Sequence, residues 1–133
     1  MDLSIIVPVY NEQDNLPLLY QAILQAIAPL QRSWELVCVD DGSHDRSVAV
    51  LEDLAARDPE HVRVIELRRN FGQTAAIAAG IDYSDGDIIV LMDADLQNDP
   101  VDIPKMLEKI DEGYDLVSGW RKDRQDDFSR TLP

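Results

Sequence analysis

The chain has 133 residues, a length that suits one compact domain rather than two. Its 26 acidic residues outnumber its 12 lysines and arginines, and the resulting formal charge of −14 argues against a nucleic-acid backbone as the main partner. A ligand that carries phosphates would need a cation or a few local arginines to offset the repulsion.

The single cysteine and the start of the chain bear on cellular location. Cys38 lies in an apolar run, so we expect a buried thiol and no internal disulfide, which fits the cytosol or a surface that faces it. Residues 2–8 contain no basic region, and their apolar run is far shorter than the roughly 20 residues that a membrane helix needs. We therefore expect neither a signal peptide nor a membrane span in this sequence.

Strands and helices alternate in the first half of the chain. Residues 3–9 and 34–39 are continuous apolar runs rich in β-branched side chains, which is typical of parallel strands that are buried on both faces. Apolar residues with helical spacing follow each strand, at 16–27 and at 48–55, the second stretch behind Asp45 as a possible cap. This order predicts right-handed crossover connections between parallel strands.

The same alternation continues after residue 60. Residues 62–65 predict a third strand, 74–79 a short alanine-rich helix that Gly80 closes, and 87–92 a fourth, central strand. Each run is short and apolar. These three elements extend the pattern of strands that alternate with helices.

The clearest helix signal in the sequence comes next. It starts with Pro100 in the first turn behind Asp99, carries an apolar stripe and stops at Gly113, and a final strand at 115–120 follows. Residues 121–133 form a charged run without apolar periodicity. The order βαβαβαβαβ predicts an α/β fold with a Rossmann-like, mostly parallel sheet and flanking helices.

Polar residues follow three of the predicted strands. In an open sheet of this type, ligands bind beyond the carboxyl ends of the strands, so these residues should meet at one edge. The candidates are Pro8, Tyr10 and Glu12 after the first strand, Asp40 and Asp41 after the second, and Asp93, Asp95 and Gln97 after the fourth.

The acidic pair Asp93 and Asp95 has the spacing of a cation site. Alternate side chains of an extended backbone point to the same side about 7 Å apart, a separation that one hydrated divalent ion can bridge. Mg²⁺ or Mn²⁺ is therefore the expected ion. Turn and cap chemistry would explain any one acidic segment alone, but three such segments at one edge favour a nucleotide and metal site.

Other nucleotide and metal signatures are weak or absent. Gly72 precedes a helix start whose N–H groups could meet a phosphate, and Arg68 and Arg69 lie just upstream, although both are equally explained as solvated surface residues. The sequence has neither a Gly-Lys-Ser/Thr phosphate loop nor a Gly-x-Gly-x-x-Gly motif. Because His44 and His61 lack partners at zinc-ligand spacing, zinc is not expected.

These segments resemble the family 2 inverting glycosyltransferases, which have the GT-A fold. The runs that carry the resemblance are Pro-Val-Tyr-Asn-Glu at 8–12, Val-Asp-Asp-Gly-Ser at 39–43 and Asp-Ala-Asp at 93–95. Within the family, Arg-Asn-Phe-Gly-Gln at 69–73 and the run at 92–100 are similar to the polyprenyl-phosphate sugar transferases, such as dolichol-phosphate mannose synthase.

The resemblance implies roles for the residues that match its motifs. Two groups follow: Pro8, Tyr10, Glu12 and Gly72, with Asp40 or Asp41, would bind the nucleotide, and Asp93, Asp95 and Gln97 would surround the Mg²⁺ or Mn²⁺ that holds the donor diphosphate. Arg121 would contact the acceptor phosphate, with Arg124 and Arg130 as companions. Asp95 and Arg121 are thus the expected catalytic residues.

The activity that the resemblance implies is metal-dependent transfer of a sugar, with inversion, from a UDP-sugar or GDP-sugar to a polyprenyl phosphate at the cytoplasmic face of a membrane. Residues 1–120 would be the nucleotide-sugar-binding part, and 121–133 the start of the acceptor region. Since family members normally continue with further catalytic residues, amphipathic helices and often membrane spans, we expect this chain to be part of a longer protein.

Two alternatives stay open: a nucleotide-binding and metal-binding module that does not transfer sugar, and a family 2 transferase with a soluble saccharide acceptor. Two other classes fit less well. A phosphoacceptor receiver domain expects its acidic pair after the first strand, and a sugar nucleotidylyltransferase expects a basic, glycine-rich loop there, where this chain has Tyr10 to Glu12.

Overall fold

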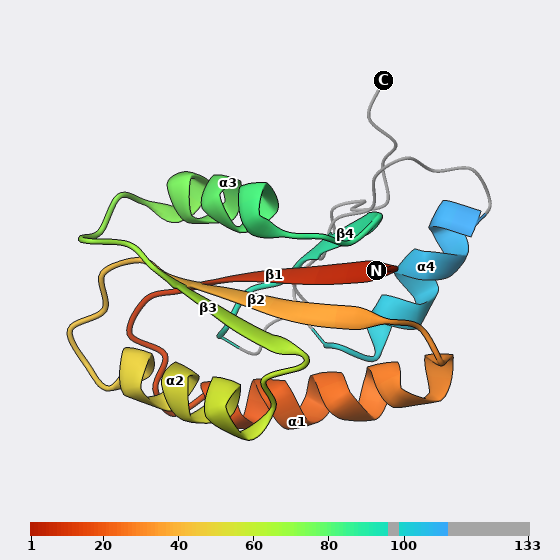
Figure 1. Cartoon of the computed structure of the whole chain (residues 1–133), viewed down its shortest axis with the longest axis horizontal. Helices are drawn as coiled ribbons and strands as arrows, with labels where there is room; N and C mark the ends of the chain where they lie inside the picture. Colours follow the sequence, from red (N-terminus) through yellow and green to blue (C-terminus); the bar gives the residue numbers. More distant parts are fainter. Residues whose placement is uncertain (96–98, 112–133) are drawn as a thin grey trace.

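The computed structural model describes residues 1–95 and 99–111, in which parallel strands alternate with helices (Figure 1). In chain order the elements are β1 (Leu3–Val9), α1 (Leu16–Ile27), the 3-10 turn η1 (Ala28–Leu30), β2 (Trp34–Asp40), α2 (Ser47–Arg57), β3 (Val62–Glu66), α3 (Gln73–Tyr83), β4 (Ile88–Leu91) and α4 (Asp102–Asp111). None of the described helices has both the length and the apolar character needed to cross a membrane.

The sheet has the strand order β3-β2-β1-β4, and every pair of neighbouring strands is parallel. The chain therefore moves outward from β1 to β3 and then returns to the other side of β1 for β4. Helices α1 and α2 cover one face of the sheet, and α3 covers the opposite face (Figure 1). Ligands in such sheets bind where the strand order reverses, which here is the gap between the carboxyl ends of β1 and β4.

Two apolar layers hold the sheet between its helices. The larger contains alternate residues of β1, such as Ile5 and Val7, together with the inner faces of α1 and α2. The smaller joins Ile6 to Ala76 of α3. Since all seven residues of β2 are buried, the prediction of a central strand is confirmed. Cys38 lies in this strand, and burial raises the pKa of its thiol to about 12.

Helix α3 is longer than the sequence predicts. Gly80, interpreted as its stop, lies inside the helix and is buried. A Cβ atom at this position would lie 2.5 Å from Cγ2 of Ile6, so glycine permits the close approach of α3 to β1 and does not end the helix.

The start of helix α4 differs slightly from the prediction. Helix α4 begins at Asp102, two residues after Pro100. The Asp99 carboxylate accepts a hydrogen bond from the N–H of Val101 at 3.0 Å, so Asp99 caps the turn that leads into the helix. The strand predicted at 115–120 lies outside the described residues.

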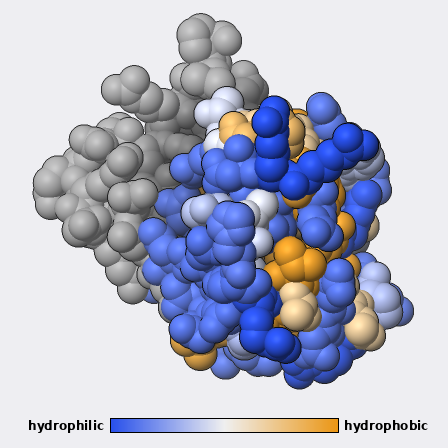
Figure 2. All heavy atoms as spheres, turned by 90° about the vertical axis from the view of Figure 1, so that its left-hand side faces the viewer, coloured by the Kyte–Doolittle hydropathy of each residue, from blue (hydrophilic) through white to orange (hydrophobic). Residues whose placement is uncertain are grey.

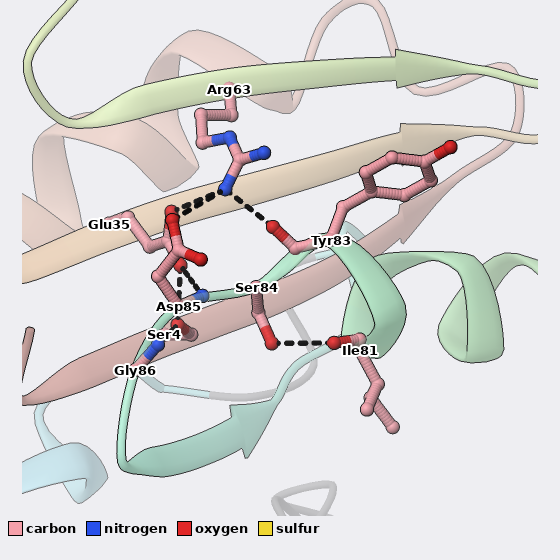
Figure 3. Close-up of polar contacts among 8 residues, drawn as sticks. All are labelled: Ser4, Glu35, Arg63, Ile81, Tyr83, Ser84, Asp85 and Gly86. Atoms are coloured by element: carbon pink, nitrogen blue, oxygen red, sulfur yellow. Dashed lines mark hydrogen bonds and ion pairs between the residues drawn. The ribbon is translucent and has the colours of Figure 1, made fainter.

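A buried carboxylate network ties the α3–β4 connection to the sheet at the edge opposite the candidate site (Figure 3). Glu35 is 2% exposed and accepts hydrogen bonds from the Ser4 hydroxyl at 2.6 Å, from the Asp85 N–H at 2.6 Å and from Arg63 at 3.0 Å. Burial alone would raise the pKa of Glu35, but these hydrogen bonds and the Arg63 charge hold it below its ordinary value.

We expect Glu35→Gln to destabilise the chain by about 3 kcal/mol at pH 7, because it leaves Arg63 and two further donors facing a neutral amide. A lowered carboxyl pKa stabilises the fold above the unfolded value of about 4.3, and this contribution disappears as the pH falls through the folded pKa. Urea unfolding should therefore show the difference from wild type shrinking in acid. Glu52→Gln, on the exposed face of α2, is the control, and equal stability of wild type and Glu35→Gln at pH 7 would contradict the prediction.

Candidate active site

A pocket of about 160 Å³ lies at the carboxyl edge of the sheet, on the end of the molecule that Figure 2 shows to be mostly hydrophilic. It is lined by residues from the ends of β1, β2 and β4 and from the start of α3: Pro8, Val9, Tyr10, Glu12, Asp41, Gln73, Asp93, Ala94 and Asp95. The structure thus brings the three predicted segments to one place. Because small-molecule sites usually measure about 300–1,000 Å³, these residues form part of a site.

The loop after β1 is held by hydrogen bonds to the loop after β2. Asn11, with φ of 54°, donates its N–H to Ser43 Oγ at 2.8 Å and accepts the N–H of His44 at 2.8 Å. The N–H of Glu12 donates to Oγ of the buried Ser47 at 2.8 Å. These contacts between distant parts of the sequence hold the backbone at Asn11 and at Glu12, which lines the pocket.

Tyr10 presents an aromatic ring at this pocket. Its side chain is 43% exposed, and its ring meets that of His44 edge to face, with 6.4 Å between centroids. Such a contact stabilises the orientation of a ring whose remaining surface can still pack against a ligand.

The two acids after β2 lie in different environments. Asp41 is 4% exposed, lines the pocket and accepts hydrogen bonds from the N–H groups of Phe71 at 2.8 Å and Gly72 at 3.1 Å. Asp40 is 1% exposed and accepts the Ser43 N–H at 3.0 Å, while its Oδ1 has no hydrogen-bond partner among the described residues. Of the two candidates for contact with a base, the structure therefore places Asp41 in the pocket lining.

The sequence predicts that the N–H groups of the helix start behind Gly72 could meet a phosphate, and the N–H of Gly72 itself comes just before them in the chain. That N–H already donates to Asp41, and Gly72 is not part of the pocket lining. The Arg69 guanidinium lies 4.6 Å from the centroid of the Phe71 ring, and Arg68 and Arg69 are both exposed outside the pocket. A phosphate at this helix would instead meet the first N–H groups of α3, which have no partner inside the helix.

Gln73 is a pocket residue that the sequence analysis missed. It is the first residue of α3, and its Nε2 donates a hydrogen bond to Asp93 Oδ1 at 3.2 Å. The predicted helix began at residue 74, so Gln73 counted as part of a loop. Two sequence signals point to it: the glycine immediately before it, which marks a helix start, and its place in the run at 69–73 that carries the family resemblance.

Among the described residues, the pocket lining carries four carboxylates, those of Glu12, Asp41, Asp93 and Asp95, and no lysine or arginine. Anionic phosphates would be repelled here unless a cation joined them. Within residues 1–95 and 99–111, no three His, Cys, Asp or Glu side chains are grouped closely enough to enclose a metal ion. Mg²⁺ in proteins is usually bound by one or two carboxylates, and water and phosphate oxygens complete its coordination. Asp93 and Asp95 fit such an ion.

Four of the predicted site residues cannot be placed in this pocket. Gln97, expected as a metal ligand, and Arg121, Arg124 and Arg130, expected at the acceptor phosphate, all lie outside the described residues. The proposed boundary at residue 120 lies there as well.

Comparison with known proteins identifies close relatives. A family model described as glycosyl transferase family 2 matches residues 4–133. The chain is 47% identical over 127 residues to the undecaprenyl-phosphate 4-deoxy-4-formamido-L-arabinose transferase of Klebsiella pneumoniae, and 44% identical over 127 residues to that of Proteus mirabilis. Each match covers 96% of this chain and 39% of the relative, so the chain spans well under half the length of these relatives.

Two solved structures have a similar fold. A structure of Staphylococcus aureus TarS 1–349 in complex with UDP-GlcNAc matches with a TM-score of 0.69 and 25% identity, over 84% of this chain and 32% of that chain. A mannosyltransferase from Pyrobaculum calidifontis in complex with GDP-Man and Mn²⁺ matches with a TM-score of 0.57 and 27% identity, over 70% of this chain and 27% of that protein. The predicted fold class, an α/β fold of the GT-A type, is confirmed, and the chain belongs to glycosyl transferase family 2.

Proposed function

We propose that this chain is the donor-binding part of a metal-dependent inverting glycosyltransferase that moves a sugar from a UDP-sugar or GDP-sugar to a polyprenyl phosphate. The observation that carries the proposal is the pocket at the carboxyl edge, with four carboxylates and no basic residue in its described lining. The names of the relatives support a polyprenyl-phosphate acceptor, and the nucleotide sugars in the two similar structures support the donor class.

The donor would lie along the edge of the sheet. Its nucleoside would pack against Tyr10 and between Pro8 and Glu12, and Asp41 would accept a hydrogen bond from the base. Asp41 suits this role because it lines the pocket, whereas Asp40 lies buried at the end of β2. Each carboxylate oxygen has more than one lone pair, so Asp41 can accept from a base while it holds the N–H groups of Phe71 and Gly72.

The donor diphosphate would lie next to Asp93 and Asp95, with Gln97 as a further ligand of a shared Mg²⁺ or Mn²⁺. When bound, this ion supplies the positive charge that stabilises the diphosphate as it leaves. Asp93 and Asp95 then serve the leaving group and do not attack the sugar. Their roles explain why a pocket for an anion is lined by acids.

Inversion follows from a single displacement at the anomeric carbon. A phosphate oxygen of the acceptor forms the new C–O bond as the bond to the nucleoside diphosphate breaks, and the electron pair of that bond leaves with the diphosphate. With a second pKa near 6, a phosphate monoester is largely dianionic at neutral pH and needs no strong general base. Arg121, with Arg124 and Arg130, would bind the acceptor phosphate at the cytoplasmic face of a membrane.

A second candidate function is nucleotide and metal binding without sugar transfer. It is favoured by the described residues, whose pocket offers groups for a nucleotide and a cation, whereas the arginines expected at an acceptor phosphate lie outside the described residues. Sugar transfer needs an acceptor site as well as a donor site.

A transfer assay separates the two functions. The chain is incubated with radiolabelled UDP-sugars or GDP-sugars and Mn²⁺, together with vesicles that contain undecaprenyl phosphate, and the lipid is then extracted. Label in the lipid that disappears with EDTA supports the transferase. Metal-dependent nucleotide binding without labelled lipid supports the binding module, and label only in an added saccharide indicates a soluble acceptor. No nucleotide binding at all would overturn both candidates.

A further inference from the structure

We infer that Gln73 is a positioning residue that sets the orientation of the Asp93 carboxylate for cation binding, an inference that rests on the proposed function. Gln73 joins the pocket lining from α3, whereas Asp93 reaches it from the segment after β4. The hydrogen bond between them, 3.2 Å from Nε2 to Oδ1, joins the helix face and the sheet edge across the pocket.

The backbone at Gln73 is firmly placed, which a positioning residue requires. The two residues before it, Phe71 and Gly72, donate their N–H groups to Asp41 at 2.8 and 3.1 Å. Three residues after it, Ala76 is fully buried between α3 and the sheet. The start of α3 is therefore anchored on both sides of Gln73, and its side chain extends from a fixed point.

The same anchor connects the two acidic segments of the site. Asp41 follows β2 and Asp93 follows β4, and β1 lies between these strands. Residues 71–73 bind Asp41 through two backbone N–H groups and Asp93 through the Gln73 side chain. Three consecutive residues therefore contact both acids.

A neutral amide suits this position chemically. An ionised carboxylate only accepts hydrogen bonds, so the Gln73 amide must turn its nitrogen towards Asp93. This hydrogen bond uses one lone pair of Oδ1 and leaves the carboxylate ionised, so Asp93 can still serve as a ligand for a cation. A lysine here would compete with the cation for Asp93, and a glutamate would add a further negative charge. Glutamine orients the carboxylate without neutralising it.

Gln73→Ala tests the inference, with Thr74→Ala as the matched control because Thr74 is the next, exposed residue of the same helix and does not line the pocket. Mn²⁺ binding is measured by electron paramagnetic resonance without nucleotide, with UDP and with GDP. Loss of a partner that orients a metal ligand typically costs 10–100-fold in affinity, and since Gln73 is exposed we expect roughly a 10-fold loss for Gln73→Ala and none for Thr74→Ala.

Two further readouts keep the inference separate from the fold and from the proposed function. The urea midpoint of Gln73→Ala without cation should equal that of wild type, so that weaker binding does not reflect unfolding. If wild type binds Mn²⁺ and Gln73→Ala binds it equally well, the inference fails and the proposed function stands. If wild type binds no Mn²⁺ alone, with UDP or with GDP, both fail.

Discussion

A Gly42→Ala chain should be about 3 kcal/mol less stable than wild type. Gly42 has a φ of 76°, in the left-handed region that costs other residues about 1–2 kcal/mol. An added Cβ would also lie less than 3.0 Å from backbone atoms of Asn70 and Arg69, and an overpacked contact of this kind typically costs about 1–3 kcal/mol. Backbone atoms cannot rotate away as a side chain could, so the loop after β3 must shift.

This shift should also weaken nucleotide binding, because the displaced loop leads directly into Phe71 and Gly72, which donate to Asp41. Gly72→Ala is the matched control: Gly72 has a φ of 105°, but a Cβ there would meet nothing within 4 Å. Both changes strain the backbone, and Gly42→Ala alone adds a clash. Urea unfolding measures the stabilities of both variants. If Gly42→Ala is no less stable than Gly72→Ala, the loop after β2 does not pack closely against Arg69 and Asn70.

Asp95→Asn should reduce the Mn²⁺-dependent affinity for UDP by about 100-fold or more, since removing only a partner of a metal ligand already costs 10–100-fold. The amide keeps the shape of the side chain but removes its negative charge. Calorimetric titration of UDP in Mn²⁺ measures the affinity.

The control for Asp95→Asn is Asp53→Asn. Asp53 lies outside the pocket, on the exposed surface of α2, where it pairs with Arg57. Asp53→Asn removes the same charge from the chain, so any loss of UDP affinity that depends only on net charge would appear in both variants. Equal UDP affinity of wild type and Asp95→Asn in Mn²⁺ would remove Asp95 from the proposed site.

The sequence predicts the strands well because each has a strong local signal. The bounds of β1 were predicted exactly as the structure has them, and β2 extends one residue further, to Asp40. Continuous runs of β-branched residues indicate strands that are buried on both faces. The edge on which ligands bind follows from strand order alone, which is why six predicted residues line one pocket: Pro8, Tyr10, Glu12, Asp41, Asp93 and Asp95.

The errors arose where long-range packing decides the outcome. Gly80 carries a stop signal in the sequence, but its close contact with Ile6, 74 residues earlier, explains it better. Gln73 belongs to the run at 69–73 that carries the family resemblance, but its partner Asp93 is 20 residues away, so no local pattern shows their contact. The choice between Asp40 and Asp41 depends on where β2 ends, and a shift of one residue in a strand reverses which side a side chain faces.

The charge network of Glu35 shows the same limit. An acid inside a predicted buried strand indicates that partners exist, but Ser4, Arg63 and Asp85 come from three separate segments. No local pattern connects these segments. The tertiary fold is needed to show that the acid is structural and lies at the edge opposite the candidate site.

The central claim is that the acidic residues at the carboxyl edge of the sheet bind a nucleoside diphosphate through a divalent cation. Calorimetric titration of UDP and of GDP into the chain, first in Mn²⁺ and then in EDTA, tests it most directly. We predict that one of the two nucleotides binds in Mn²⁺ and that this binding is lost in EDTA. Equal affinity in Mn²⁺ and EDTA, or no binding of either nucleotide in Mn²⁺, would contradict the account.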